Sequence, residues 1–76
     1  MIGEHDRVVL TADVLEHGLT AGDIGTVVHV YRDGRAYEVE FVALDGETAA
    51  VVTVEANNLR PVRRHEIAHV RSLAAA

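Results

Sequence analysis

The sequence predicts a small all-β domain in which five strands close into a barrel, followed by a short C-terminal α-helix. Two Asp-Gly pairs, at 33–34 and 45–46, separate runs of alternating apolar and polar residues, a pattern typical of consecutive hairpins. The chain has only 76 residues, so it has room for one core. We therefore expect one folding unit, with the barrel in residues 1–63 and the helix or tail in residues 64–76.

The three central strands are expected at 24–31, 36–43 and 48–54, joined by the two Asp-Gly turns. If both turns contain two residues, the register pairs His29 with Glu38, Val28 with Val39, and Val42 with Ala49. One face of this meander then forms the core. The predicted core residues are Val28, Val30, Tyr37, Val39, Phe41, Ala50, Val52 and Val54.

The remaining strands are short and lie at either end of the meander. Residues 7–10 form a β-branched first strand, and residues 11–22 form a long loop that we expect Leu15 and Leu19 to anchor. A tight turn at 55–58 leads into a last strand at 59–62. This succession of a strand, a long loop, a meander and a final strand gives the order of an SH3-like barrel.

The C-terminal segment shows helical spacing and carries the pattern H-E-x-x-H. Ile67, Val70 and Leu73 would share one face of a helix over residues 65–73. On such a helix His65 and His69 could bind a metal, with Glu66 as a base. Only seven residues follow His69, and none of them is a metal ligand, so we expect neither catalysis nor a cofactor. Adventitious metal binding by the two histidines is the alternative.

Charge is distributed unevenly along the chain. Residues 1–59 carry eleven acidic residues and three arginines, a net charge of −8, whereas residues 60–76 carry four arginines and one glutamate, a net charge of +3. An acidic body repels phosphate, so we expect no strong binding of nucleic acid. The longest apolar runs are only a few residues, which predicts neither a signal peptide nor a membrane span, and hence a cytoplasmic location.

The opposite face of the meander is about half apolar, which is unusual for a solvated surface. It carries Val27, Val42 and Val51, with Tyr31 at its edge. The C-terminal helix folds back over these side chains, or strong curvature of the barrel buries them locally, or a protein partner or a second copy of the chain docks there. In the last case the neighbouring arginines, Arg63 and Arg64, would steer the approach.

Three motifs resemble those of known small domains. They are Glu16-His-Gly-Leu-x-x-Gly22-Asp-x-Gly25, Ala36-Tyr-Glu-Val-Glu-Phe41 and Leu59-Arg-Pro-Val62. The second follows a Gly-rich turn and strand, as in KOW-type and other SH3-like barrels. Together the three motifs are similar to a family of small bacterial proteins, domain of unknown function 4926.

The resemblance implies free-standing single domains, some of which look like one half of toxin–antitoxin-like gene pairs. It implies no catalytic residues. The sequence therefore predicts a non-catalytic protein-binding module, the antitoxin-like or adaptor half of a small bacterial operon. A nucleic-acid-associated, KOW-like barrel that uses its Arg-rich tail is the alternative function.

Overall fold

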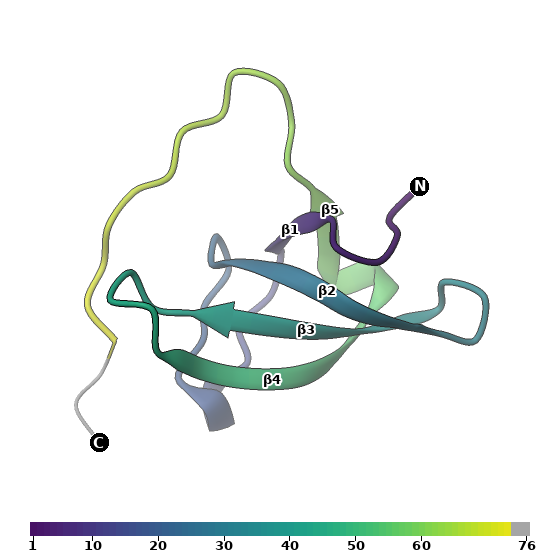
Figure 1. Ribbon diagram of the computed structural model, residues 1–76, viewed down its shortest axis with the longest axis horizontal. Helices are drawn as coiled ribbons and strands as arrows, with labels where there is room; N and C mark the ends of the chain where they lie inside the picture. The colour runs from purple at the N-terminus through teal and green to yellow at the C-terminus, as the bar shows by residue number, and fades with distance from the viewer. Residues whose placement is uncertain (74–76) are drawn as a thin grey trace.

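The computed structural model describes residues 1–73 and contains one sheet of five antiparallel strands (Figure 1). The strands are β1 (Arg7–Leu10), β2 (Ile24–Tyr31), β3 (Ala36–Val42), β4 (Thr48–Glu55) and β5 (Leu59–Pro61). Their order across the sheet is β4-β3-β2-β1-β5. The all-β prediction with five strands is confirmed, and so is the tight turn before the last strand, a 3₁₀ turn η2 (Ala56–Asn58).

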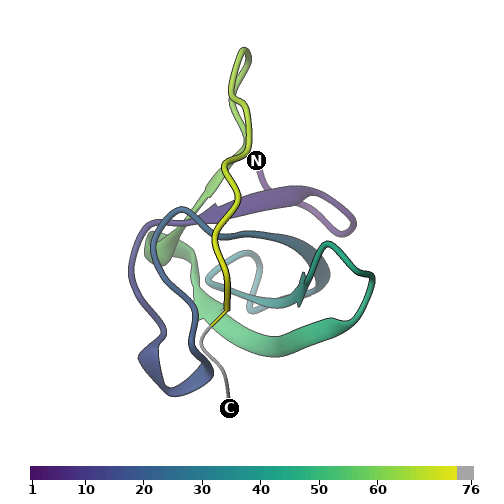
Figure 2. The same cartoon turned by 90° about the vertical axis from the view of Figure 1, so that its left-hand side faces the viewer.

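The sheet curls around its core, but the predicted closure into a barrel is wrong (Figure 2). β5 has only three residues and pairs with β1 alone, while β4 pairs only with β3. Pro61 ends β5 and has no N–H with which to continue a ladder. One seam between the two outer strands therefore stays open among the described residues.

The long loop between β1 and β2 is held by one leucine rather than by the two expected. It contains a 3₁₀ turn η1 (Leu15–His17), which ends at Gly18 in the left-handed conformation with φ 69°. Leu19 is buried in the core, whereas Leu15 is exposed. A bridge between Val14 and Leu19 closes the loop.

A β-bulge in β2 exchanges the predicted orientations of Val27 and Val28, so that Val27 faces the core and Val28 faces outward. The pairs next to the hairpin, including His29 with Glu38, are as expected, but Val39 pairs with Val27 instead of Val28. The extra residue at Val28 shifts the alternation by one. Val27 is consequently 0% exposed and Val28 is 42% exposed.

The two hairpin turns are longer than the two-residue turns predicted. Arg32 and Asp33 take positive φ angles ahead of Gly34, within a four-residue loop that keeps the neighbouring pairs in register. In the second loop Gly46 has φ 94°, and the Ala43 N–H donates to the carbonyl of Glu47. A register shift after Phe41 then pairs Val42 with Thr48 rather than with Ala49.

The core lies inside the curl of the sheet and is almost entirely aliphatic. Five predicted members are buried, while Val30 and Ala50 are partly buried and pack against them. β1, Leu19, Val27 and Leu59 complete it. The buried cluster is Val8, Leu10, Leu19, Val27, Tyr37, Val39, Phe41, Val52, Val54 and Leu59.

The predicted C-terminal helix is also wrong, because residues 62–73 form an extended segment without regular structure. We call this segment the strap. It turns back beyond β5 and runs across the open end of the curled sheet (Figures 1 and 2). A nine-residue helix has little stability by itself, and the Ile67 side chain finds no apolar surface to pack on, since it is 95% exposed. Residues 74–76 of the predicted tail lie outside the described residues.

The bulge predicts that aspartate will be tolerated very differently at two adjacent positions. Val27→Asp should lower the free energy of unfolding by about 3 kcal/mol or more, because it buries an unpaired carboxylate. Val28→Asp should cost about 1 kcal/mol or less, since that side chain is partly solvated. Urea unfolding of both variants measures the difference, and equal losses would contradict the bulge.

Candidate functional site

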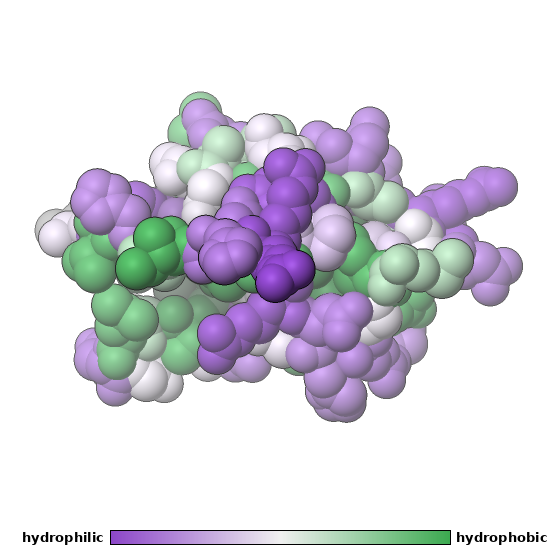
Figure 3. All heavy atoms as spheres, turned by 90° about the horizontal axis from the view of Figure 1, so that it is seen from above, coloured by the Kyte–Doolittle hydropathy of each residue, from purple (hydrophilic) through white to green (hydrophobic). Residues whose placement is uncertain are grey.

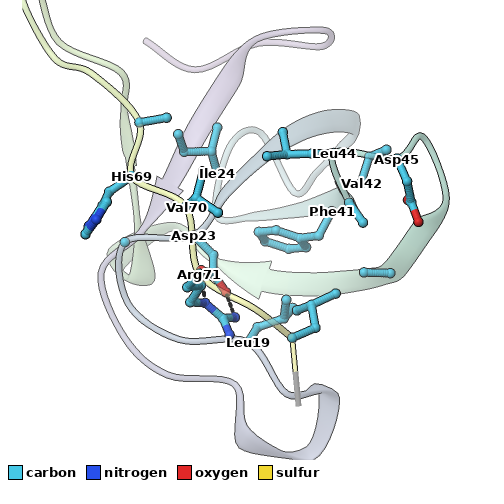
Figure 4. Close-up of a pocket in the computed structure, with 15 residues that line it drawn as sticks. Leu19, Asp23, Ile24, Phe41, Val42, Leu44, Asp45, His69, Val70 and Arg71 are labelled. Atoms are coloured by element: carbon cyan, nitrogen blue, oxygen red, sulfur yellow. Dashed lines mark hydrogen bonds and ion pairs between the residues drawn. The ribbon is translucent and has the colours of Figure 1, made fainter. Parts of the chain in front are cut away.

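A groove of about 450 Å³ opens at the end of the sheet, between the β1–β2 loop, the β3–β4 hairpin and the strap (Figure 4). Leu19 and Phe41 come from the core and form its floor. Ile24, Val42 and Leu44 form its rim. The groove is thus apolar along the sheet, and its charged groups come from Asp23 in the β1–β2 loop, Asp45 in the β3–β4 hairpin and Arg71 in the strap.

An ion pair between Asp23 and Arg71 fastens the strap across this groove (Figure 4). Arg71 Nε donates to Asp23 Oδ1 at 2.8 Å, and Nη2 donates to Oδ2 and to the carbonyl of Gly18, the latter at 3.1 Å. The backbone N–H of Thr20 also donates to Asp23 Oδ2 at 2.9 Å. The guanidinium therefore binds the Asp23 carboxylate through two nitrogens, a bidentate arrangement typical of arginine recognition. It also donates to the carbonyl of Gly18.

The pKa of Asp23 reflects opposing influences. Partial burial raises it, but hydrogen bonds from Arg71 and Thr20 and the charge of Arg71 outweigh this effect. The net pKa lies below its ordinary value of 3.8. Asp23 is thus held as a carboxylate, the form that an arginine partner requires.

A second ion pair fixes the turn at which the strap reverses direction. Arg60 Nη1 and Nη2 donate to the two carboxylate oxygens of Glu66 at 2.9 and 2.6 Å, and the N–H of Arg63 donates to Glu66 Oε1 at 2.6 Å. His65 takes φ 65° at the reversal. The Arg60 hydrogen bond, followed by that of Arg63, lowers the pKa of Glu66 from 4.5 to about 2.

Between these two anchors the strap packs poorly on the body. Ile67 is 95% exposed and Val70 is 72% exposed. A second cavity, of about 310 Å³, lies on the other side of the strap, between it, β1 and β5. In Figure 3, apolar atoms gather at the end of the molecule where the strap and the β3–β4 turn lie.

The outer face of β3 and β4 is the other candidate surface. Val42 and Val51 are 49% and 48% exposed there, and Tyr31 is exposed at its edge, as predicted. Glu38 and Glu40 lie between them, and each accepts a hydrogen bond from a threonine hydroxyl of β4, at 2.6 and 2.8 Å. This surface is therefore aliphatic with fixed acidic groups.

The structure does not bring all the predicted partner-binding residues together. Val27 lies in the core, so it is not part of any exposed surface. Arg63 and Arg64 lie in the turn of the strap beyond β5, on the side of the molecule away from β4 in Figures 1 and 2. Of the six predicted partner-binding residues, only Val42, Val51 and Tyr31 share the outer face of the meander.

The two C-terminal histidines are not arranged as a metal-binding pair on a helix. Without a helix, and with His65 at positive φ, His65 and His69 lack the geometry of the H-E-x-x-H motif. In Figure 4 His69 points away from the groove. Residues 1–73 contain no cluster of three or more groups that could hold a metal. His29 pairs with Glu38 in register, but its nearest carboxylate is that of Glu4, with 3.7 Å between Nδ1 and Oε2.

The Asp23–Arg71 pair was missed by sequence reasoning. Asp23 falls in the Gly-rich turn before β2, and Arg71 falls in the segment that is expected to be helical. The two residues are 48 positions apart, and no local pattern connects them. The excess of arginine after residue 59, next to an acidic body, was the only available signal for such a contact.

Comparison with known proteins identifies the family to which residues 4–61 belong. The chain belongs to the family described as a domain of unknown function (DUF4926), whose model matches residues 4–61. The match includes the floor and the rim of the groove and ends before the strap. No curated protein and no solved structure matched the chain. The described residues include no helix that is long and apolar enough to cross a membrane.

The Arg60–Glu66 pair predicts an unusually acidic glutamate. NMR titration of the Glu66 carboxyl group should give a midpoint near 2, and Arg60→Ala should return it toward 4.5. Because the folded-state pKa is depressed, the pair stabilises the strap turn above about pH 4.5, and this contribution is lost as the pH falls toward 2. An unchanged midpoint in Arg60→Ala would contradict the assigned cause.

Proposed function

We propose that the protein is a non-catalytic protein-binding module that receives a partner on the outer face and free edge of β4. The observation that carries this proposal is the combination of exposed Val42 and Val51 with an unpaired edge. β4 is eight residues long and, within residues 1–73, pairs only with β3. Its residues 48–54 make no backbone hydrogen bond outside that ladder within the described chain.

An unpaired edge strand of this length is a template for an added strand. Its free N–H and C=O groups can pair with an extended segment, while side chains at alternate positions contact the outer face. Val51 stands near the middle of β4, so an added strand would cover it. We therefore infer that the partner contributes an extended segment.

The charges around the edge favour a basic partner over a second copy of the chain. Antiparallel pairing of two β4 strands about Val51 would place Glu47 of one copy opposite Glu55 of the other. Glu38 and Glu40 add negative charge on the same face. A strand with alternating aliphatic and basic side chains would instead complement both the valines and the carboxylates.

The nucleic-acid alternative has less support. Two of the four arginines after residue 59, Arg60 and Arg71, pair with carboxylates. The remaining two, Arg63 and Arg64, could supply about two phosphate contacts, which would give only weak, salt-sensitive binding. We propose an antitoxin-like or adaptor role in the cytoplasm for the module, on a fold that we infer to be SH3-like with one open seam. The strand order and the long first loop support that inference.

An alternating arginine–valine heptapeptide should bind at the β4 edge. In ¹⁵N NMR titrations it should shift the amides of residues 48–54, whereas a glutamate–valine heptapeptide should not. Val51→Arg should abolish the shifts by removing an apolar contact and adding repulsion. It should change stability by about 1 kcal/mol or less, because Val51 is half exposed.

The matched control is Val62→Arg, because Val62 is also partly exposed but lies just beyond β5. It should bind the basic peptide as the parent does. Equal binding by the Val51 and Val62 variants, or shifts confined to another part of the molecule, would contradict this surface.

A further inference from the structure

The groove beneath the strap contains a guanidinium-binding site that belongs to the body. Asp23 is oriented by the Thr20 N–H, a contact made without the strap. The Gly18 carbonyl is presented by a left-handed residue, whose own N–H donates to Leu15 at 3.0 Å. Both acceptors are therefore positioned by contacts that do not involve the strap.

The apolar side of the groove is only partly filled by the strap. Its floor is formed by Leu19 and Phe41, and its rim residues Ile24, Val42 and Leu44 remain exposed while the strap is in place. The open volume of about 450 Å³ lies next to the ion pair. Larger aliphatic side chains beside an arginine would fill space that the strap leaves open.

The strap itself is held by few contacts. Residues 67–73 make no backbone hydrogen bond to the described body, so Arg71 provides the polar attachment at this end. Val70, the neighbour of Arg71, is 72% exposed, and Leu73, which also lines the groove, is 44% exposed. The described strap therefore buries little apolar surface. An ion pair that is partly open to water contributes about 1 kcal/mol or less, so the strap is a weak occupant.

We propose that this groove is a binding site for an extended peptide of another protein, carrying an arginine flanked by large aliphatic residues. The chain's own strap occupies the site as a weak intramolecular competitor. The Asp23 carboxylate and the Gly18 carbonyl receive the guanidinium, and Leu19, Phe41 and Leu44 receive the aliphatic side chains. This site lies at the end of the sheet and meets the β4 surface only at Val42 and Ala49, so it does not depend on the β4 edge.

A partner of different sequence is favoured over the strap of a second copy. An identical strap makes the same few contacts but lacks the high effective concentration of a tethered segment, which is in the millimolar range for short linkers. It would therefore lose to the intramolecular strap. A peptide with larger aliphatic residues gains additional contacts and can displace the strap.

The test uses the full chain and the probe Leu-Ile-Arg-Leu-Leu, capped at both ends, followed by ¹⁵N NMR. The peptide should shift amides in residues 18–24 and 41–45. It should bind Arg71→Ala up to about fivefold more tightly than wild type, because that variant lacks a competitor that is worth about 1 kcal/mol or less. The double variant Asp23→Asn with Arg71→Ala should bind the peptide no more tightly than wild type does, because it lacks the carboxylate that receives the guanidinium.

The peptide in which arginine is replaced by glutamine is the matched control. It should bind Arg71→Ala clearly more weakly than the arginine peptide does, and this comparison keeps the test decisive if the double variant fails to fold. Equal affinity of the arginine peptide for wild type and Arg71→Ala would overturn the proposal, as would shifts outside the groove. A wild-type dimer that Arg71→Ala abolishes would overturn the assignment to another protein and identify a second copy as the occupant.

Discussion

The curvature of the sheet depends on Gly25, a residue of β2 whose missing side chain lets its backbone lie directly against Val39 and Phe41 of β3. β2 is the strand that both halves of the sheet share, because it pairs with β1 near its start and with β3 over the rest. A Cβ atom at Gly25 would lie 2.5 Å from Val39 Cγ1, 2.9 Å from Phe41 Cε1 and 3.0 Å from the carbonyl oxygen of Glu40. Such distances are shorter than van der Waals contact, so only glycine fits here.

This contact also places the groove. Phe41, which Gly25 touches, forms the floor, and the residues just before Gly25 contribute the rim and the carboxylate of Asp23. The β1–β2 loop and the β3–β4 hairpin face each other because the strands that carry them are in such close contact. The arginine site and the apolar floor are thus consequences of how β2 packs.

The sequence predicted those parts of the fold that local chemistry determines. Alternation and Asp-Gly pairs identified the meander, and five of the eight predicted core residues are buried. The bulge at Val28 could not be predicted, because Val27 and Val28 are chemically identical and only packing decides which one turns inward. The Gly-rich motif predicts that Gly25 serves the turn before β2, whereas its role is steric and involves Val39 and Phe41 of the next strand. The strap was misassigned for a similar reason: helical spacing is local, and the Arg71–Asp23 contact that extends the segment is not.

The close contact between β2 and β3 at Gly25 is tested most directly by urea unfolding of the variants Gly25→Ala and Gly3→Ala. At Gly3 the nearest atom to an added Cβ is 4.0 Å away, so that variant controls for the loss of glycine itself. Gly25→Ala should lower the free energy of unfolding by about 1–3 kcal/mol, as expected for overpacking. Gly3→Ala should change it by less than about 0.5 kcal/mol. Equal stability of the two variants would show that β2 and β3 do not meet as described, and the groove would lose its structural basis.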